Sequence, residues 1–373
     1  MISSWPPRLT AWATDYRRKE AALFPAVLRK MRKGILPALC IICALPLCAE
    51  AGLQADEQAT IEVFERVSPS VVFIKNAALQ WDWFSTYIYE IPQGAGSGFI
   101  WDAEGHIVTN FHVIYQADKI EVILSDRNSY QAEVVGGSPD HDLAVLKINA
   151  PVELLQSIPV GSSGGLRVGQ KVLSIGNPFG LDYSLTTGVV SALGRSMRSI
   201  GGRKIHDVIQ TDAAINVGNS GGPLLDSSGN LIGVATSIYS PSGASAGVGF
   251  AIPVDTVKRV VPQLITCGKV RRAGLGISLV PDYIRQRLGI EGALIMEVSR
   301  GGAADEAGLR GMRRNLFGEV LYGDIIISVD GKPIESSDRL SEFFDHKKVG
   351  DEVAIRFRRQ DTEYDVTAVL QEL

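Results

Sequence analysis

Short apolar runs separated by turn-forming residues fill the middle of the chain. They recur about every 8–20 residues, and no long helical patterns alternate with them. This spacing is typical of an all-β domain, a barrel or a sandwich, and not of a doubly wound parallel sheet. The predicted strands begin near Val71 and are Gly98–Asp102, His106–Asn110, Lys119–Leu124, Gln131–Gly136, Leu143–Ile148, Lys171–Ile175, Gly188–Ala192, Val208–Thr211, Leu231–Ser237 and Gly247–Ile252.

Helical spacing of apolar residues occurs on either side of this β-rich region. It predicts a short helix over Thr60–Val67 and a second helix over Asp255–Cys267, which Gly268 would end. The aromatic-rich residues 76–93 are predicted to be irregular. Residues 269–273 resemble a linker, and about 100 residues follow it.

This last part mixes the two patterns and is of a size to fold by itself. Its predicted helical stretches are Ala303–Ala307 and Asp338–Phe344. Its predicted strands are Leu294–Val298, Asp324–Val329, Glu352–Arg356 and Tyr364–Leu370. The sequence therefore predicts a mainly β domain over residues 52–268 and an α+β domain over residues 269–373.

The first 51 residues differ in composition from the rest. Residues 1–33 carry eight basic and two acidic residues, a net +6; since the whole chain is −4, the remainder carries −10. No basic stripe suited to nucleic acid occurs. A 14-residue apolar run, Ile35–Cys48, follows Met31-Arg32-Lys33 and precedes Ala49-Glu50-Ala51. These features predict an export signal over residues 31–51; an uncleaved anchor helix is the alternative. After cleavage only Cys267 remains, which excludes an internal disulfide.

A serine among glycines is the strongest candidate for chemistry. Ser220 lies in Gly218–Pro223 (GNSGGP), between apolar, strand-like residues. Glycines allow backbone N–H groups to point inward, as an oxyanion hole requires. A hairpin without chemistry would show the same local pattern, so a base and an orienting carboxylate are needed to decide.

The chain has five histidines and offers one well-placed pair. His112 follows a predicted strand, and Asp142 directly precedes another. His106 is predicted to be solvated in a hairpin turn. The chain order of the candidates is therefore His112, Asp142 and Ser220.

The sequence resembles the HtrA/Deg family of trypsin-like serine proteases, and most closely its plant-chloroplast and cyanobacterial branch. The resemblance covers about residues 60–373. Its segments are Gly96–Asn110 (GSGFIWDAEGHIVTN), Thr109–Ile114 (TNFHVI), Asp142–Ile148 (DLAVLKI), Gly176–Leu181 (GNPFGL), Gln210–Leu225 (QTDAAINVGNSGGPLL) and Ile238–Val257 (IYSPSGASAGVGFAIPVDTV).

The resemblance implies a chymotrypsin-like double β-barrel, a single PDZ domain, usually a trimeric assembly, and no metal or cofactor. It implies His112 as general base, Asp142 as the group that orients it, and Ser220 as nucleophile. The N–H groups of Gly218 and Ser220 would form the oxyanion hole.

The primary substrate pocket follows from the same resemblance. Ala214, Ile215 and Asn216 would line it, and without a carboxylate there the pocket should prefer small or medium aliphatic side chains. Residues 196–207 and 239–246 resemble loops that gate activity in the family. Val217 departs from the commonest family pattern. Because Val217 adjoins the predicted oxyanion loop, we expect this departure to affect the flexibility of that loop.

In the last domain, Gly274–Ile277 (GLGI) resembles the PDZ carboxylate-binding loop. Residues Gly274, Leu275, Gly276 and Ile277 would capture the end of a peptide, and Leu340, Phe343 and Phe344 would line the groove.

These observations predict an ATP-independent serine endopeptidase that degrades unfolded or damaged exported proteins in the periplasm. Two alternatives stay open: a membrane-anchored regulatory stress sensor, and a PDZ-based chaperone or adaptor. The thylakoid lumen is the alternative location.

Overall fold

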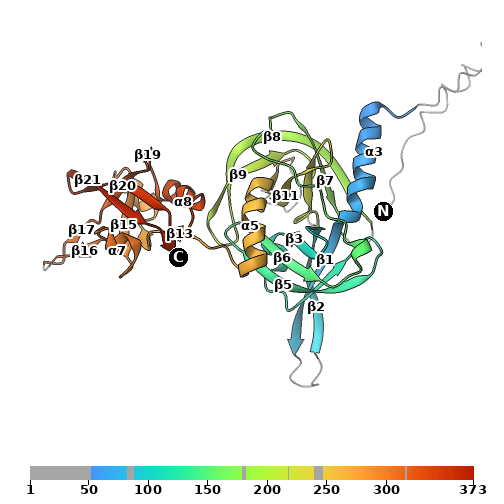
Figure 1. Cartoon of the computed structure of the whole chain (residues 1–373), viewed down its shortest axis with the longest axis horizontal. Coiled ribbons are helices and arrows are strands. Elements are labelled where there is room, and N and C mark those ends of the chain that lie inside the picture. The colour runs from blue at the N-terminus through green and yellow to red at the C-terminus, as the bar shows by residue number, and fades with distance from the viewer. Residues whose placement is uncertain (1–51, 82–87, 179–181, 217, 239–246, 316) are drawn as a thin grey trace, which may run out of the picture. The chain divides into compact units, whose positions relative to one another are not determined.

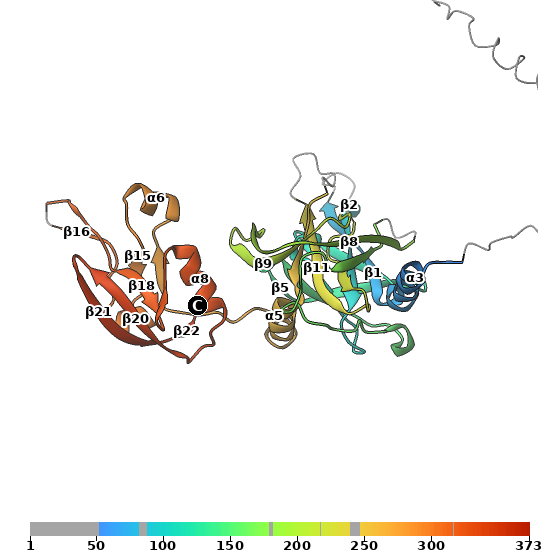
Figure 2. The ribbon, with the colours of Figure 1, turned by 90° about the horizontal axis from the view of Figure 1, so that it is seen from above.

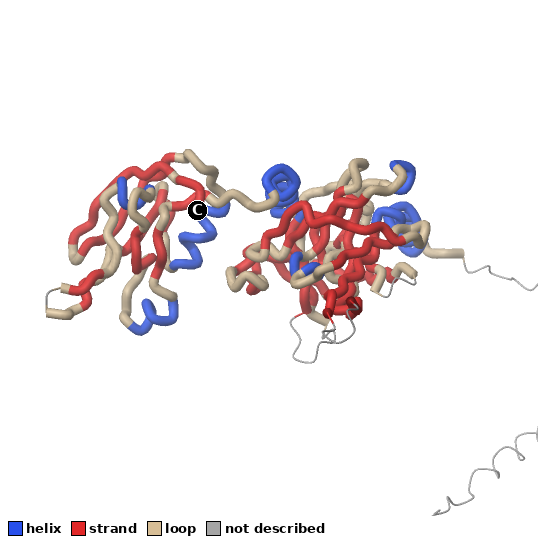
Figure 3. Tube along the Cα trace, turned by 90° about the horizontal axis from the view of Figure 1, so that it is seen from below, coloured by secondary structure: helices blue, strands red, loops and turns tan. Residues whose placement is uncertain are grey.

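The computed structural model describes residues 52–81, 88–178, 182–216, 218–238, 247–315 and 317–373. The predicted export signal, Val217 and the predicted loop 239–246 lie outside the described residues. Strands are more abundant than helices in the described chain (Figure 3). No helix in these ranges is both long enough and apolar enough to cross a membrane.

The first half of the predicted β domain is a closed six-stranded antiparallel barrel with the order β1-β2-β3-β6-β5-β4. Its core includes Ile74, Ile100, Ile107 and Leu146, which are fully buried. Burial alternates along β4, as expected for a strand with one face inward. The strands are β1 (Val71–Trp81), β2 (Ile88–Ile100), β3 (His106–Thr109), β4 (Lys119–Ile123), β5 (Ser129–Ser138) and β6 (Leu143–Ile148).

The second half is another closed six-stranded barrel, with the order β10-β11-β12-β9-β8-β7. β8 and β9 are much longer than the predicted strands. They pair as far as Arg198 and Lys204, so most of the predicted loop 196–207 is a hairpin. The strands are β7 (Lys171–Gly176), β8 (Ser184–Arg198), β9 (Lys204–Thr211), β10 (Pro223–Asp226), β11 (Leu231–Ile238) and β12 (Gly249–Pro253).

One apolar core joins the two barrels and two helices. Helix α5 (Val254–Cys267) contributes Val257, Val260, Val261 and Leu264, all fully buried. Gly268 ends it in the left-handed conformation (φ 70°), as predicted, and its N–H donates to Leu264 O at 3.0 Å. Helix α3 (Ala55–Val67) lies on the outside of the barrels in both views (Figures 1 and 2). Three short helical turns complete this part: η1 (Ser68–Ser70), α4 (Phe111–Ile114) and η2 (Val152–Leu154).

The irregular structure predicted for residues 76–93 is wrong wherever the structure describes them. β1 continues to Trp81, β2 begins at Ile88, and the two strands pair up to Trp81 opposite Ile88. A bulge between Asn76 and Ala77 shifts the register. The sequence pattern concealed these strands because aromatic residues interrupt the alternation that a half-buried strand shows.

The C-terminal part is an α+β fold around a sheet of order β14-β15-β18-β20-β21, with β19 paired to β18. Ser336 caps the N-terminus of helix α8 (Ser337–Asp345), because its hydroxyl accepts the N–H of Arg339. The remaining elements are β13 (Ala273–Gly274), β14 (Ile277–Leu279), α6 (Asp282–Arg287), β15 (Ala293–Val298), α7 (Ala303–Glu306), β16 (Arg313–Arg314), β17 (Val320–Leu321), β18 (Ile325–Val329), β19 (Lys332–Pro333), β20 (Glu352–Arg359), β21 (Thr362–Val369) and β22 (Gln371–Glu372).

Candidate active site

His112 and Asp142 form a direct pair across the first barrel. His112 lies on α4, just after β3, and Asp142 directly precedes β6. The ring Nδ1 of His112 is 2.8 Å from Asp142 Oδ2 and 3.0 Å from Oδ1, and the His112 N–H donates to Oδ1 at 3.0 Å. A carboxylate on this side holds the proton on Nδ1. The other ring nitrogen, Nε2, is then free to accept a proton.

The carboxylate of Asp142 is buried, and polar groups surround it. Its side chain is 5% exposed, whereas that of His112 is 32% exposed. Thr236 on β11 donates its hydroxyl to Asp142 Oδ2 at 2.8 Å, and Asn110 Nδ2 donates to the Asp142 main-chain oxygen at 2.9 Å. The bonds from Thr236 and the His112 N–H compensate for the loss of water around the buried carboxylate, and the Asn110 bond holds the backbone that carries it.

Sequence reasoning missed both Thr236 and Asn110. A signal for Thr236 was present, because it and Ser237 interrupt the apolar residues of β11. Thr236 belongs to the second barrel and Asp142 to the first, so a side chain from each barrel holds the pair in place.

The loop that carries Ser220 depends on glycine at two positions. Gly218 and Gly221 have φ of 102° and 84°, values that other residues rarely adopt. A Cβ on Gly218 would lie 2.4 Å from Pro178 Cα, and one on Gly221 would lie 2.2 Å from Ser97 O. Both positions therefore require glycine for space as well as for conformation.

The loop is also packed closely against the segment that holds His112. A Cβ on Gly96 would meet Val113 Cγ2 at 2.7 Å and Ser220 O at 3.1 Å. Val113 directly follows His112 on α4. The chain segments that carry the three predicted catalytic residues thus meet at one place, between the two barrels.

The three residues predicted to line the substrate pocket lie in different surroundings. Ile215 is fully buried beside Gly249, Ala214 is half-buried, and Asn216 is exposed. The main-chain oxygen of Ala214 accepts the Thr186 hydroxyl at 3.1 Å. Their role in binding substrate stays a prediction.

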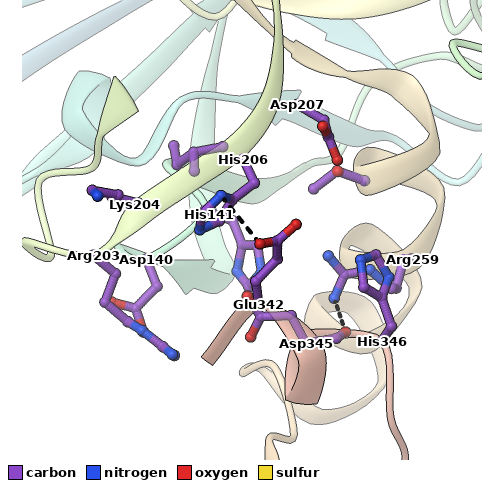
Figure 4. A pocket seen from close by; sticks show the side chains of 12 residues that line it. Asp140, His141, Arg203, Lys204, His206, Asp207, Arg259, Glu342, Asp345 and His346 are labelled. Carbon is purple, nitrogen blue, oxygen red and sulfur yellow. Dashed lines mark hydrogen bonds and ion pairs between the residues drawn. The ribbon is translucent and has the colours of Figure 1, made fainter. Parts of the chain in front are cut away.

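Two other histidines are buried away from this site. The prediction that His106 is solvated is wrong, because it is 6% exposed and its Nδ1 lies 2.7 Å from Asp102 Oδ2. His141 is 8% exposed, and the Ser138 hydroxyl lies 2.7 Å from its Nδ1. It lines a pocket with Arg203 and Arg259 (Figure 4).

The surroundings of His141 oppose its protonation. Burial, with the charges of Arg259, Arg203 and Arg272, lowers the pKa of His141 to about 3 from its ordinary 6.5. Between these values the unfolded chain binds a proton that the folded chain does not. The contribution of neutral His141 to the stability of the folded state is therefore complete above pH 6.5, and it is lost as the pH falls toward 3.

This pKa shift predicts a pH-dependent stability. Replacing His141 with glutamine should remove a dependence of up to about 1.4 kcal/mol per pH unit between pH 4 and 6. Urea unfolding of both proteins at several pH values measures their free energies of unfolding. Subtracting one protein's values from the other's removes the contribution of the carboxylates, which titrate in both. Equal pH slopes would show that folding does not lower the pKa of His141.

In the C-terminal domain, the predicted peptide-binding residues run from Gly274, the end of β13, to Ile277, the start of β14. Gly276 has φ of 69°, and its oxygen accepts the N–H of Ser299 at 2.8 Å. Leu275 is buried, and its oxygen accepts the N–H of Ala304 at 2.9 Å. Ile277, Leu279, Leu340 and Phe344 line one pocket beside this turn.

Comparisons with known proteins agree with this architecture. A model of the trypsin-like peptidase domain matches residues 96–234, and a model of the PDZ domain matches residues 273–370. Protease Do-like 1, chloroplastic, of Arabidopsis thaliana is 52% identical over 320 residues, which are 86% of this chain and 73% of the relative. A probable periplasmic serine endoprotease DegP-like of Brucella suis is 38% identical over 287 residues, which are 76% of this chain and 53% of the relative.

Comparison with solved structures also finds serine proteases. The HtrA-type protease AlgW with a decapeptide has 32% sequence identity and a TM-score of 0.69, covering 84% of this chain and 98% of that structure. The serine endoprotease from Yersinia pestis has 32% identity and a TM-score of 0.62, covering 84% and 98%.

Two closed six-stranded barrels followed by a PDZ domain define a serine endopeptidase of chymotrypsin-like fold. The predicted fold class is thereby confirmed. With the identity to the Do-like relative over most of both chains, this protein belongs to the HtrA/Deg family of serine proteases.

Proposed function

We propose that this protein is an ATP-independent endopeptidase that cleaves unfolded or damaged exported proteins with His112, Asp142 and Ser220. The observation that carries the proposal is the buried carboxylate of Asp142, which binds both the ring and the backbone N–H of His112. A histidine held in this tautomer is suited to act as a base toward a neighbouring hydroxyl.

In the proposed mechanism, His112 Nε2 takes the proton of Ser220 Oγ as this oxygen bonds to the peptide carbonyl carbon. The carbonyl oxygen becomes an oxyanion, which the N–H groups of Gly218 and Ser220 stabilise. His112 then gives its proton to the leaving amine, and the C–N bond breaks. Water repeats the sequence on the acyl-enzyme, and Asp142 stabilises the imidazolium each time.

The proposed oxyanion hole has support in the hydrogen bonds of the loop. The N–H groups of Asn219, Gly221 and Gly222 donate to Asn216 O, Ala235 O and Asn219 O. Within the described part of the chain, the N–H groups of Gly218 and Ser220 have no such acceptor. Two free N–H groups next to the nucleophile are what a developing oxyanion needs.

The proposed specificity is for aliphatic side chains at the cleaved bond. Ala214 and Ile215 offer no charge to pair with lysine or arginine, and burying an unpaired cation there would be costly. In a peptide library, cleavage after valine, alanine or leucine should exceed cleavage after lysine or arginine by at least about tenfold. Rapid cleavage after arginine with none after valine would refute this.

We further propose that the PDZ domain binds C-terminal or extended peptide segments through Gly274–Ile277, as an added strand. The AlgW structure named above is of a relative with a decapeptide, which supports a peptide ligand. Relatives named periplasmic and chloroplastic support an exported or organellar location. For the assembly we propose a homotrimer or a multiple of trimers, on the family resemblance.

The proposed function is tested with β-casein and a fluorophosphonate, a reagent that forms a covalent bond to an activated serine. We expect degradation of β-casein without ATP, complete inhibition by the reagent, and one labelled residue, Ser220, in the digested protein. Labelling of a different serine with equal loss of activity would overturn the assignment. If the protein is inactive alone, a peptide with a hydrophobic C-terminus is added, and continued absence of both labelling and cleavage refutes the proposal.

A further inference from the structure

Ser97 is a polar residue in a fully buried position, on β2 beside the loop that carries Ser220. It is 0% exposed, and it lies between two glycines and ahead of the apolar residues that end the strand. Serine is usually exposed. A hydroxyl buried at this place therefore calls for a reason beyond packing.

Every polar group of Ser97 is used, and three of the four bonds reach the second barrel. Its hydroxyl donates to Gly218 O at 2.6 Å and accepts the N–H of Asn177 at 2.8 Å. Its main-chain N–H donates to Ser220 O at 2.9 Å, and its main-chain oxygen accepts the Thr109 hydroxyl at 2.8 Å. Ser97 thus contacts the loop at both residues of the proposed oxyanion hole.

These contacts fix two of the three peptide planes around Ser220. Because a peptide unit is planar, holding the oxygen of one residue also sets the direction of the N–H of the next residue. Ser97 holds the oxygens of Gly218 and Ser220, while Gly222 N–H holds the oxygen of Asn219. The Ser220 N–H shares its plane with the Asn219 oxygen, and Ser97 holds the planes on both sides of it, so the rotation of this central plane is restricted from both ends.

We propose that Ser97 is a positioning residue for the oxyanion hole. Its hydroxyl holds the Gly218 carbonyl, which belongs to the peptide unit between the two units that carry the N–H groups of Gly218 and Ser220, and so limits the rotation of these two N–H groups relative to each other. Without it, the Gly218 oxygen and the Asn177 N–H would both be buried without partners, and a glycine with positive φ has the freedom to rotate away. This inference rests on the proposed function.

The test is the variant Ser97→Ala, with kcat and KM measured on an aliphatic peptide substrate. Loss of an aligned oxyanion donor affects the transition state more than the bound substrate. We expect kcat to fall about 10- to 100-fold and KM to change less than about threefold. The affinity for a peptide boronate, which forms a tetrahedral adduct with the catalytic serine, should weaken by the same factor as kcat/KM.

Two further variants separate positioning from stability. Ser97→Thr keeps the hydroxyl and should retain kcat within about tenfold. Ser174→Ala is the matched control, since Ser174 is also fully buried on a strand, and its hydroxyl has no partner among the described residues. It should leave kcat and boronate affinity unchanged. If Ser97→Ala does not fold, Ser97→Cys keeps the volume with a weaker donor and should show the same selective loss of kcat.

The outcomes distinguish this proposal from the function beneath it. If the unchanged protein is labelled at Ser220 but Ser97→Ala has normal kcat and boronate affinity, the positioning role is wrong and the proposed function stands. Equal losses in the Ser97 and Ser174 variants would assign both residues to folding alone. If the unchanged protein is never labelled at Ser220, the proposed function itself fails.

Discussion

Replacing Ser220 with alanine is expected to abolish peptide hydrolysis while leaving the fold intact. Without the Oγ atom no acyl-enzyme forms, and only weak catalysis by the remaining groups is left, so kcat should fall by at least about 10⁴-fold. The measurement is β-casein degradation by equal amounts of both proteins, with cleavage sites read by mass spectrometry. The alanine is tolerated because Ser220 is only half-buried and its main-chain oxygen, which accepts the N–H of Ser97, is unchanged.

A matched control for this variant is Ser227→Ala, an exposed serine in the turn between β10 and β11. It should have full activity. Equal cleavage by the Ser220 variant and the unchanged protein would mean that the nucleophile is another residue or that a contaminating protease is present. Thermal unfolding of the Ser220 variant should occur within about 2 °C of the unchanged protein, because exposed or half-buried substitutions usually change stability little.

Replacing Asp142 with asparagine should have the second largest effect, a fall in kcat of about 10⁴-fold. Asparagine has nearly the same shape, but its NH₂ group would face His112 Nδ1 as a donor. The ring would then carry its proton on Nε2 and could not accept one from Ser220. The variant should bind substrate normally, so KM is expected to stay within a few-fold of its normal value, as steady-state kinetics will show.

Asp140→Asn is the control for the loss of a carboxylate charge near the site. Asp140 is two residues away and pairs with Arg272 at 2.9 Å instead of with a histidine. Its loss should leave kcat within about threefold. If both aspartate variants kept normal kcat, Asp142 would have no part in catalysis and His112 would act without an orienting carboxylate.

Most of the predicted strands and helix α5 followed from the sequence because one of their faces is buried, whereas α3 begins five residues before the predicted Thr60. The predicted strand Leu143–Ile148 is β6 to the residue, and the helix before Gly268 is α5. Where polarity on the outer face is mixed, the pattern fails. Only the middle of β8 was predicted, since most of its residues are half-buried or exposed and alternation along it is weak.

The candidate site was predictable in its residue types and not in its supporting contacts. His112, Asp142 and Ser220 lie in short motifs that can be read along the chain. Thr236 and Ser97 act across the two barrels, and sequence separation conceals such contacts: Thr236 is 94 residues from Asp142. His106 was misjudged for a related reason, because the Asp102 carboxylate that pairs with it allows a polar ring to be buried.

The hydrogen bond from the Thr236 hydroxyl to Asp142 joins the two barrels, so the site depends on the folding of both. The carboxylate belongs to one barrel, and its hydroxyl partner and the serine loop belong to the other. A chain with only one barrel folded has no complete site. On the proposed function, proteolytic activity therefore requires both barrels to be folded, so a copy with only one folded barrel cannot cleave its unfolded neighbours.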